Sequence, residues 1–184
     1  MATKYRTHLN KWFNCRRCAS LRKKQVVLLR GKIPAPILFV GEAPGVSEDV
    51  IGIPFVGPAG KLLDRMLEEG LDGQVDYCIT NLVACIPRVI GEDKMEAPTE
   101  ESIYNCRERL EEVFTICNPV ATVAVGKLAE KWLPSNFGEN QLGKMFSVIH
   151  PAAILRLDIS QKSLAIQRNI VTISEVADYV LGED

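Results

Sequence analysis

Four short apolar segments constrain the fold more than any other feature of this sequence. They cover residues 36–40, 75–80, 120–125 and 145–149, and a glycine or a polar residue stands at the end of each. Continuous apolar runs of this length are typical of strands buried on both faces of a parallel sheet. Helical patterns follow them, over residues 58–70, 98–117, 127–133 and 160–181. The alternation predicts an α/β fold in which helices cover both faces of a four-stranded parallel sheet.

The remaining segments carry weaker signals. We expect a short helix over residues 5–20, an edge strand over 26–29, and a loop rich in glycine and proline over 41–57. A second long loop precedes the helical pattern at residue 98. The 184 residues contain no internal repeat or low-complexity linker. One domain over residues 1–184, with a basic segment 1–35 packed on it, is therefore expected.

Glycine and polar residues follow the predicted strands. Gly41–Gly45 (GEAPG) follows the first strand, Asn81 the second, Gly126 the third and His150 the fourth. Ligands of parallel α/β sheets bind at the carboxyl ends of the strands, which share one edge of the sheet. A glycine at such a position can also simply form a turn, and that interpretation suffices for Gly126. Glu42, Asn81 and His150 together indicate one shared site.

Charge is distributed unevenly along the chain, although the formal net charge is only -1. Residues 1–41 hold ten Lys and Arg and no acidic residue, whereas the rest of the chain holds 12 basic and 23 acidic residues. A basic segment on an acidic body indicates a polyanionic partner; the alternative is that these charges only solvate a surface. No apolar run approaches the roughly 20 residues of a membrane helix, and the first residues lack a signal-peptide core. We expect a cytoplasmic protein with no membrane partner.

Six cysteines are many for a cytoplasmic chain of this size. They are Cys15, Cys18, Cys78, Cys85, Cys106 and Cys117. A reducing compartment disfavours a disulfide framework, which leaves metal or cluster ligation as the better interpretation. The Cys15-x-x-Cys18 pair with distant cysteines suits either zinc or an iron–sulfur cluster, and the residues alone do not choose between them. Cys78 lies within a predicted strand, where a buried thiol is the simpler interpretation.

Several longer motifs occur in a specific order. They are GEAPG (41–45), Glu48-Asp49, PFVGPAGKLLDRML (54–67), ITN (79–81) followed by Cys85, and HPAAILR (150–156). GEAPG alone is a weak signal, but the ordered set covers nearly the whole chain. On these motifs the chain resembles the family 4 uracil-DNA glycosylases, the iron–sulfur branch of their superfamily. The resemblance implies a monomeric α/β/α domain of a prokaryotic or phage-infected cell that removes uracil from DNA and leaves an abasic site for base excision repair.

The resemblance also implies a 4Fe–4S cluster rather than zinc. By position its ligands would be Cys15, Cys18, Cys85 and Cys106. Cys117 is the alternative fourth ligand. Cys106 is preferred because it follows Pro98 at a distance similar to that in the family.

For the base pocket, the resemblance implies that Phe55 stacks on a flipped-out base and that Asn81 reads its edge. An amide suits this task because it presents a donor and an acceptor side by side. Gly41 and Ala43 would line the same pocket. Breaking the N-glycosidic bond builds negative charge on the base, so His150 would donate to the base O2. The simpler alternatives are a core aromatic for Phe55, a cap or turn residue for Asn81 and a structural histidine for His150.

Two carboxylates are candidates for activating water. Family 1 relatives carry an aspartate where this chain has Ala43, so that carboxylate is absent. By resemblance, Glu42 would contact the base or the water, and Glu48 would orient the water or the loop. The sequence does not separate either residue from an ordinary surface carboxylate.

The HPAAILR segment is expected to enter the DNA minor groove. Ile154 or Leu155 would fill the space that the flipped base leaves. Lys127 and Arg156 are expected to contact phosphates.

The chain departs from the family pattern around the expected pocket. The basic, proline-rich run after the third cysteine is replaced by ACIPR (84–88), and an arginine before PFVG is replaced by Ile53. The loop over residues 89–97 is longer than usual and contains the acidic residues Glu92, Asp93 and Glu96. These changes leave the expected reaction type intact but open the question of which base is the substrate. The alternatives are a uracil glycosylase, a phage- or defence-related glycosylase for another modified pyrimidine, a non-catalytic DNA-binding module and a zinc-binding α/β protein.

Overall fold

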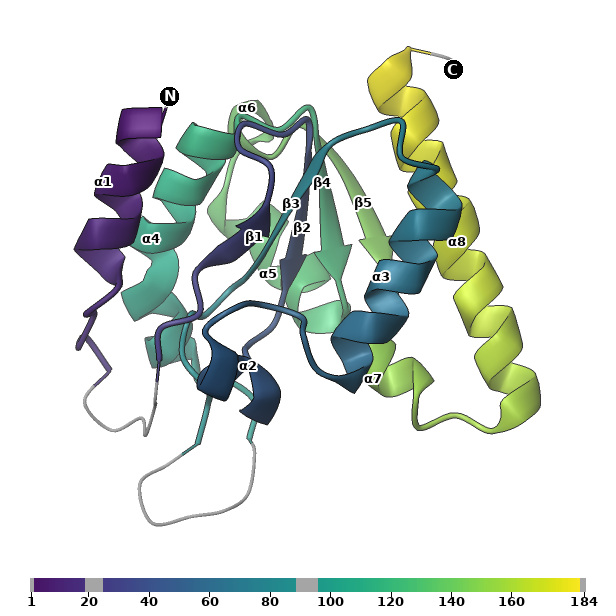
Figure 1. Ribbon diagram of the computed structural model, residues 1–184, viewed down its shortest axis with the longest axis horizontal. Helices are drawn as coiled ribbons and strands as arrows, with labels where there is room; N and C mark the ends of the chain where they lie inside the picture. The colour runs from purple at the N-terminus through teal and green to yellow at the C-terminus, as the bar shows by residue number, and fades with distance from the viewer. Residues whose placement is uncertain (1, 19–24, 89–95, 183–184) are drawn as a thin grey trace.

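The computed structural model describes residues 2–18, 25–88 and 96–182, and it contains a five-stranded sheet in the order β1-β3-β2-β4-β5 (Figure 1). The strands are β1 (Leu29–Gly31), β2 (Ile37–Gly41), β3 (Tyr77–Asn81), β4 (Ala121–Val125) and β5 (Lys144–Val148). The strands β2 to β5 pair in parallel, which confirms the predicted α/β sheet. The expected count of four is one too low, because β1 pairs antiparallel with β3 at the edge.

The edge strand lies further along the chain than the apolar pattern indicates. We expected it over residues 26–29, but β1 covers Leu29–Gly31. Val27 donates its backbone N–H to the Ala84 carbonyl at 2.8 Å instead of joining the ladder with β3. Val26, Val27 and Leu28 are buried nevertheless. Their apolar character reflects packing outside the ladder.

Helices cover the sheet in two layers (Figure 1). On one face lie α1 (Ala2–Trp12), α4 (Glu100–Cys117), α5 (Lys127–Asn136) and α6 (Glu139–Leu142); on the other lie α3 (Pro58–Leu71), α7 (Pro151–Ile154) and α8 (Ile159–Leu181). The strand β2 serves both layers because successive side chains point to opposite faces. Leu38 and Val40 join the core under α4, while Ile37 and Phe39 join the core under α3. Among the described residues, no helix has both the length and the apolar character needed to cross a membrane.

The first two helices differ from expectation, and the short helices α6 and α7 were not expected. The segment expected to be a loop contains α2 (Val46–Ile51), because Glu48 at the third helical position accepts the Gly45 N–H at 3.0 Å and caps the helix. Gly52 then ends α2 in the left-handed conformation at φ 80°. The first helix ends at Trp12 rather than near residue 20, since Cys15 donates its N–H to Trp12, only three residues back, at 3.0 Å.

Polar contacts fasten α1 to α4. The Glu112 carboxylate bonds to His8 Nδ1 at 2.9 Å and accepts the Trp12 indole N–H at 2.6 Å. Lys11 forms ion pairs with both Glu112 and Glu108. His8 and Trp12 are each 2% exposed, so these contacts lie at the core boundary.

The basic segment is partly neutralised by the rest of the protein. Of its seven basic residues that the structure describes, four form ion pairs with carboxylates; these four are Lys11, Arg17, Arg30 and Lys32. Fewer unpaired positive charges are therefore available to a polyanionic partner than the sequence alone suggests.

We predict that Glu112→Ala destabilises the fold more than Glu108→Ala does. The first change leaves the buried His8 and Trp12 nitrogens without their carboxylate, a loss of about 1–3 kcal/mol in the free energy of unfolding. The second removes only exposed ion pairs, and its loss is smaller. Urea unfolding of both variants measures the difference. Equal losses would contradict the assignment of Glu112 as the anchor of α1.

Candidate active site

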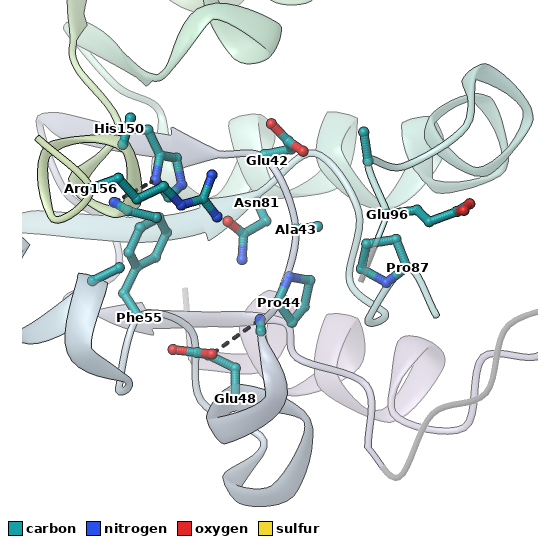
Figure 2. Close-up of a pocket in the computed structure, with 15 residues that line it drawn as sticks. Glu42, Ala43, Pro44, Glu48, Phe55, Asn81, Pro87, Glu96, His150 and Arg156 are labelled. Carbon is teal, nitrogen blue, oxygen red and sulfur yellow. Dashed lines mark hydrogen bonds between the residues drawn. The ribbon is translucent and has the colours of Figure 1, made fainter. Parts of the chain in front are cut away.

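A cavity of about 460 Å³ opens where the parallel strands end (Figure 2). This volume is within the range of small-molecule sites. Its walls come from the ends of β2 and β3, from the segment between α2 and α3, and from α7. It is lined by Glu42, Ala43, Pro44, Gly45, Glu48, Phe55, Ala59, Asn81, Pro87, Glu96, Ala97, His150, Ala152, Ala153 and Arg156. The structure thus brings together Glu42, Asn81 and His150, which lie at the ends of three different strands.

Asn81 presents an unsatisfied amide to the cavity. It is the last residue of β3 and lies in register with Gly41 at the end of β2. Its side chain is buried, and in the part of the chain that the structure describes, no donor reaches its Oδ1. A buried acceptor without a donor costs about 1–3 kcal/mol, so folding alone does not favour it. A ligand with an N–H group would satisfy this oxygen.

Phe55 forms a wall of the cavity beside His150. The two ring centroids are 5.9 Å apart, with the ring planes inclined at 31°. The φ of Phe55 is 55°, in the left-handed region where a non-glycine residue costs about 1–3 kcal/mol. Gly60 allows this backbone path, because a Cβ at that position would overlap the Phe55 carbonyl. A Cβ on Gly41 would lie 2.5 Å from Phe55 Cζ, so only glycine at this position avoids a clash with the Phe55 ring.

Glu48 uses both carboxylate oxygens to hold the loop. Its Oε1 accepts the N–H groups of Val56 at 2.9 Å and Gly57 at 2.8 Å, and its Oε2 accepts that of Gly45 (Figure 2). The carboxylate thereby ties the start of α2 to the segment that carries Phe55. Although Glu48 lines the cavity, its bonds suit it to positioning the loop.

Glu42 differs from Glu48 in having an available carboxylate. It is the first residue after β2, it lines the cavity, and no described residue bonds to its side chain. Burial raises the pKa of the Glu42 carboxyl above its ordinary value. A partly desolvated carboxylate without a partner is a better proton acceptor than one saturated with N–H donors.

His150 is held with one ring nitrogen as an acceptor. The Ala152 N–H, at the start of α7, donates to His150 Nδ1 at 3.1 Å. Burial, with the Arg156 charge as a second cause, lowers the pKa of His150, which favours the neutral imidazole. Because Nδ1 accepts, the single ring proton of the neutral form lies on Nε2. His150 is therefore a neutral hydrogen-bond donor at the cavity.

The remaining predicted residues flank this group to different extents. Arg156 lines the cavity. Lys127 is exposed at the start of α5, and Gly126, the residue before it, faces His150. Leu155 is 39% exposed, whereas Ile154 is 0% exposed and packs in the core with α3 and α8. Of the two expected apolar wedges, only Leu155 has a side chain at the surface.

The cysteines divide into two sets. Cys78 and Cys117 are fully buried; the hydrogen bond between their thiols, together with burial, raises the pKa of Cys78. Cys85 and Cys106 are buried in the hydrophobic cluster to which Cys78 and Cys117 also belong, and Cys15 packs against it. The Asn105 amide donates to Cys18 Sγ at 3.9 Å. Among the described residues, no three His, Cys, Asp or Glu side chains stand together as a ready-made metal site.

Comparison with known proteins decides the family. The model of the uracil DNA glycosylase superfamily matches residues 28–170. A type-4 uracil-DNA glycosylase of Archaeoglobus fulgidus is 34% identical over 161 residues, covering 77% of this chain and 78% of the relative. The one of Saccharolobus solfataricus is 33% identical, with 77% and 72% covered.

The chain belongs to the type-4 uracil-DNA glycosylases. This confirms the resemblance seen in the sequence motifs. A further family member, from Sulfurisphaera tokodaii, is 38% identical over 129 residues, which are 69% of this chain. The match spans 56% of that relative, slightly more than half its length.

A solved structure supports the fold independently. The crystal structure of Pedobacter heparinus SMUG2 superposes with a TM-score of 0.56 and covers 82% of this chain and 77% of its own. At 16% sequence identity, this likeness concerns the fold alone.

Several residues around the site were not predicted as site residues. Pro87, Glu96 and Ala97 line the cavity, and Glu96 donates its N–H to the Pro87 carbonyl at 3.2 Å, which closes the base of the long loop. The acidic residues Glu92 and Asp93 lie outside the described residues. Arg109 lies buried against the end of β3, although charged residues of a helix are usually at the surface.

We predict that Arg156→Gln raises the pKa of His150. The Arg156 charge disfavours the imidazolium, so its removal moves the midpoint upward toward the ordinary value of 6.5. The chain has two histidines, and NMR titration of their ring protons follows both, with His150→Gln assigning the signals. The His8 midpoint should not move. An unchanged His150 midpoint would show that the Arg156 charge does not act on it.

Proposed function

We propose that this protein excises uracil from DNA by hydrolysing the N-glycosidic bond. The observation that carries the proposal is the buried Oδ1 of Asn81, which has no donor among the described residues, in a cavity that His150, a hydrogen-bond donor, also lines. The relatives are named uracil-DNA glycosylases, and the family is therefore the second support. An enzyme of this kind extrudes the nucleotide from the stack into a pocket.

Asn81 would select uracil by its edge. Uracil carries an N3–H donor beside its O4 acceptor, and the amide can answer with Oδ1 and Nδ2 respectively. Cytosine presents an amino donor and a bare N3 at these positions. It would leave the buried Oδ1 of Asn81 without a donor, a mismatch that discriminates strongly. Phe55 would support the ring from below.

His150 and Glu42 would serve the reaction itself. The water oxygen forms a bond to C1′ while the bond from C1′ to uracil N1 breaks, and its electron pair stays on the uracil. The Nε2–H of neutral His150 would donate to uracil O2, where the negative charge develops. Glu42 would take the proton from the water, since its carboxylate has no partner among the described residues. Glu48 would hold the loop that carries Phe55, and Gly41 and Ala43 would leave room for the base.

Leu155 and two cations would hold the DNA. Leu155, exposed directly after α7, would fill the gap in the base stack. Arg156, which lines the cavity, and Lys127, which is exposed at the start of α5, would contact phosphates. Ile154 has no such role, because it is part of the core.

We also propose that Cys15, Cys18, Cys85 and Cys106 hold a 4Fe–4S cluster. Cys18 contacts Asn105, the residue before Cys106 on α4, and Cys15 packs against the hydrophobic cluster that contains Cys85 and Cys106 and also Cys117. Cys117 fits less well, because its thiol bonds to that of Cys78 in the core. When bound, the cluster would supply metal–thiolate bonds that tie the segment after α1 to α4 and to the segment after β3.

We predict that Asn81→Ala and His150→Gln each lower the rate of uracil release on the order of a hundredfold, as loss of a transition-state contact does. The assay incubates the protein with end-labelled oligonucleotides that carry uracil, cytosine or a 5-substituted uracil, and alkali then cleaves abasic sites. Asn140→Ala, an exposed change on α6, is the control. Full activity in both variants would reject the residue assignment. Cleavage only at the 5-substituted uracil would show that this base, and not uracil, is the substrate.

We predict that the purified protein contains about four iron and four acid-labile sulfide per chain. Cys106→Ala should lose the cluster and its visible absorption, whereas Cys117→Ala should keep both. Metal analysis and absorption spectra of the two variants provide the measurement. Zinc in place of iron, or iron lost only from the Cys117 variant, would contradict the proposed ligand set.

A further inference from the structure

Arg109 is a buried guanidinium directed at the end of the strand that carries Asn81. It lies on α4 and is 1% exposed. Its Nη1 donates to Thr80 Oγ1 at 2.9 Å, and its Nη2 donates to the carbonyls of Asn81 and of Leu82, the latter at 3.1 Å. Its Nε has no acceptor in the described part of the chain. Three consecutive residues at the end of β3 are thus held by one side chain.

This arrangement is costly for the fold alone. The salt bridges among the described residues do not include Arg109, so carbonyl and hydroxyl oxygens alone solvate its charge. Burying a charge without an opposite charge is expensive, and an apolar side chain at such a position is often neutral or stabilising. The guanidinium fork therefore needs an explanation besides stability.

The segment that Arg109 holds also supports the neighbouring strand end. The Leu82 N–H donates to the Gly41 carbonyl at 2.9 Å, and the Val83 N–H donates to the Glu42 carbonyl at 3.3 Å. Glu42, directly after Gly41, lines the β2 side of the cavity, and Asn81 lines the β3 side. One buried cation thus braces the backbone beneath both polar walls, while it does not line the cavity itself.

We propose that Arg109 is a positioning residue that sets the direction of the Asn81 amide toward the flipped base. The inference rests on the proposed role of Asn81 in reading uracil. The planar fork of the arginine bonds a hydroxyl and two carbonyls at fixed angles, which fixes the Asn81 backbone and hence the path of its side chain. Lysine keeps the charge but has no fork, so it cannot hold these acceptors together.

A double-mutant cycle between Arg109→Lys and Asn81→Ala tests the proposal. Arg109→Lys should lower the single-turnover rate of uracil release on the order of a hundredfold, as misplacement of a catalytic contact does. Its affinity for undamaged DNA should stay unchanged. In the Asn81→Ala background, Arg109→Lys should have no further effect on the rate. Arg107→Lys, on the same helix but paired with Glu111 at the surface, should leave the rate unchanged.

The outcomes separate the two proposals. Independent, multiplicative losses in the double variant would overturn the role of Arg109 while leaving Asn81 as the base reader. An Asn81→Ala variant with full activity would instead overturn the proposed role of Asn81 on which this inference rests, and a parent protein that releases no uracil would overturn the proposed function. Arg109→Lys could also lose activity only because part of the protein unfolds at the assay temperature. A rise in the unfolded fraction that matches the rate loss would overturn the positioning role of Arg109.

Thr80→Val provides a second measurement if Arg109→Lys does not fold. It removes one acceptor of the fork and the 2.6 Å bond from Thr80 to the Leu28 carbonyl, with little change in volume. Thr122→Val is the matched control, because Thr122 is equally buried on β4 and also bonds a backbone carbonyl, that of Leu142. Thr80→Val should slow uracil release well beyond Thr122→Val at comparable thermal stability. Equal rates in the two variants would overturn the proposal.

Discussion

Parallel pairing of β2 with β3 is the interaction on which the site depends. In the observed register Gly41 lies beside Asn81, and a shift of one residue would turn the Asn81 side chain to the other face of the sheet. The register is secured from both sides of β2, since Leu38 and Val40 fill one core while Ile37 and Phe39 fill the other. A slip would therefore place each of these side chains in the wrong layer. The position of the polar walls follows from apolar packing.

The two carboxylates of the cavity have different roles because their contacts differ. Glu48 accepts three backbone N–H groups and joins α2 to the Phe55 segment, so its charge is already compensated. Glu42 receives no such bond from the part of the chain that the structure describes, and burial raises its pKa. Their spacing in the sequence does not reveal this difference. It arises because α2, capped by Glu48, turns that carboxylate toward its own loop.

Much of the fold could be predicted from the sequence, because the parallel strands are buried on both faces and are therefore apolar throughout. The helix α2 was missed since glycine and proline around it usually mark loops, and its cap depends on a contact between Gly45 and Glu48. Ile154 and Leu155 could not be separated, because both are apolar and α7 is only one turn long. Only the packing of α7 against α3 decides which of them is buried.

Arg109 shows the limit of sequence reasoning most clearly, because its role depends on contacts across the core. On α4, Cys106 precedes it by one turn, and both side chains are buried. In the other chain segment, Cys85 follows Asn81 by four residues. Two proposed cluster ligands thus lie close in sequence to the two ends of the Arg109 to Asn81 contact. A cluster that joins Cys106 to Cys85 would therefore hold α4 and the end of β3 together around the same contact, so it can support base recognition without touching the base.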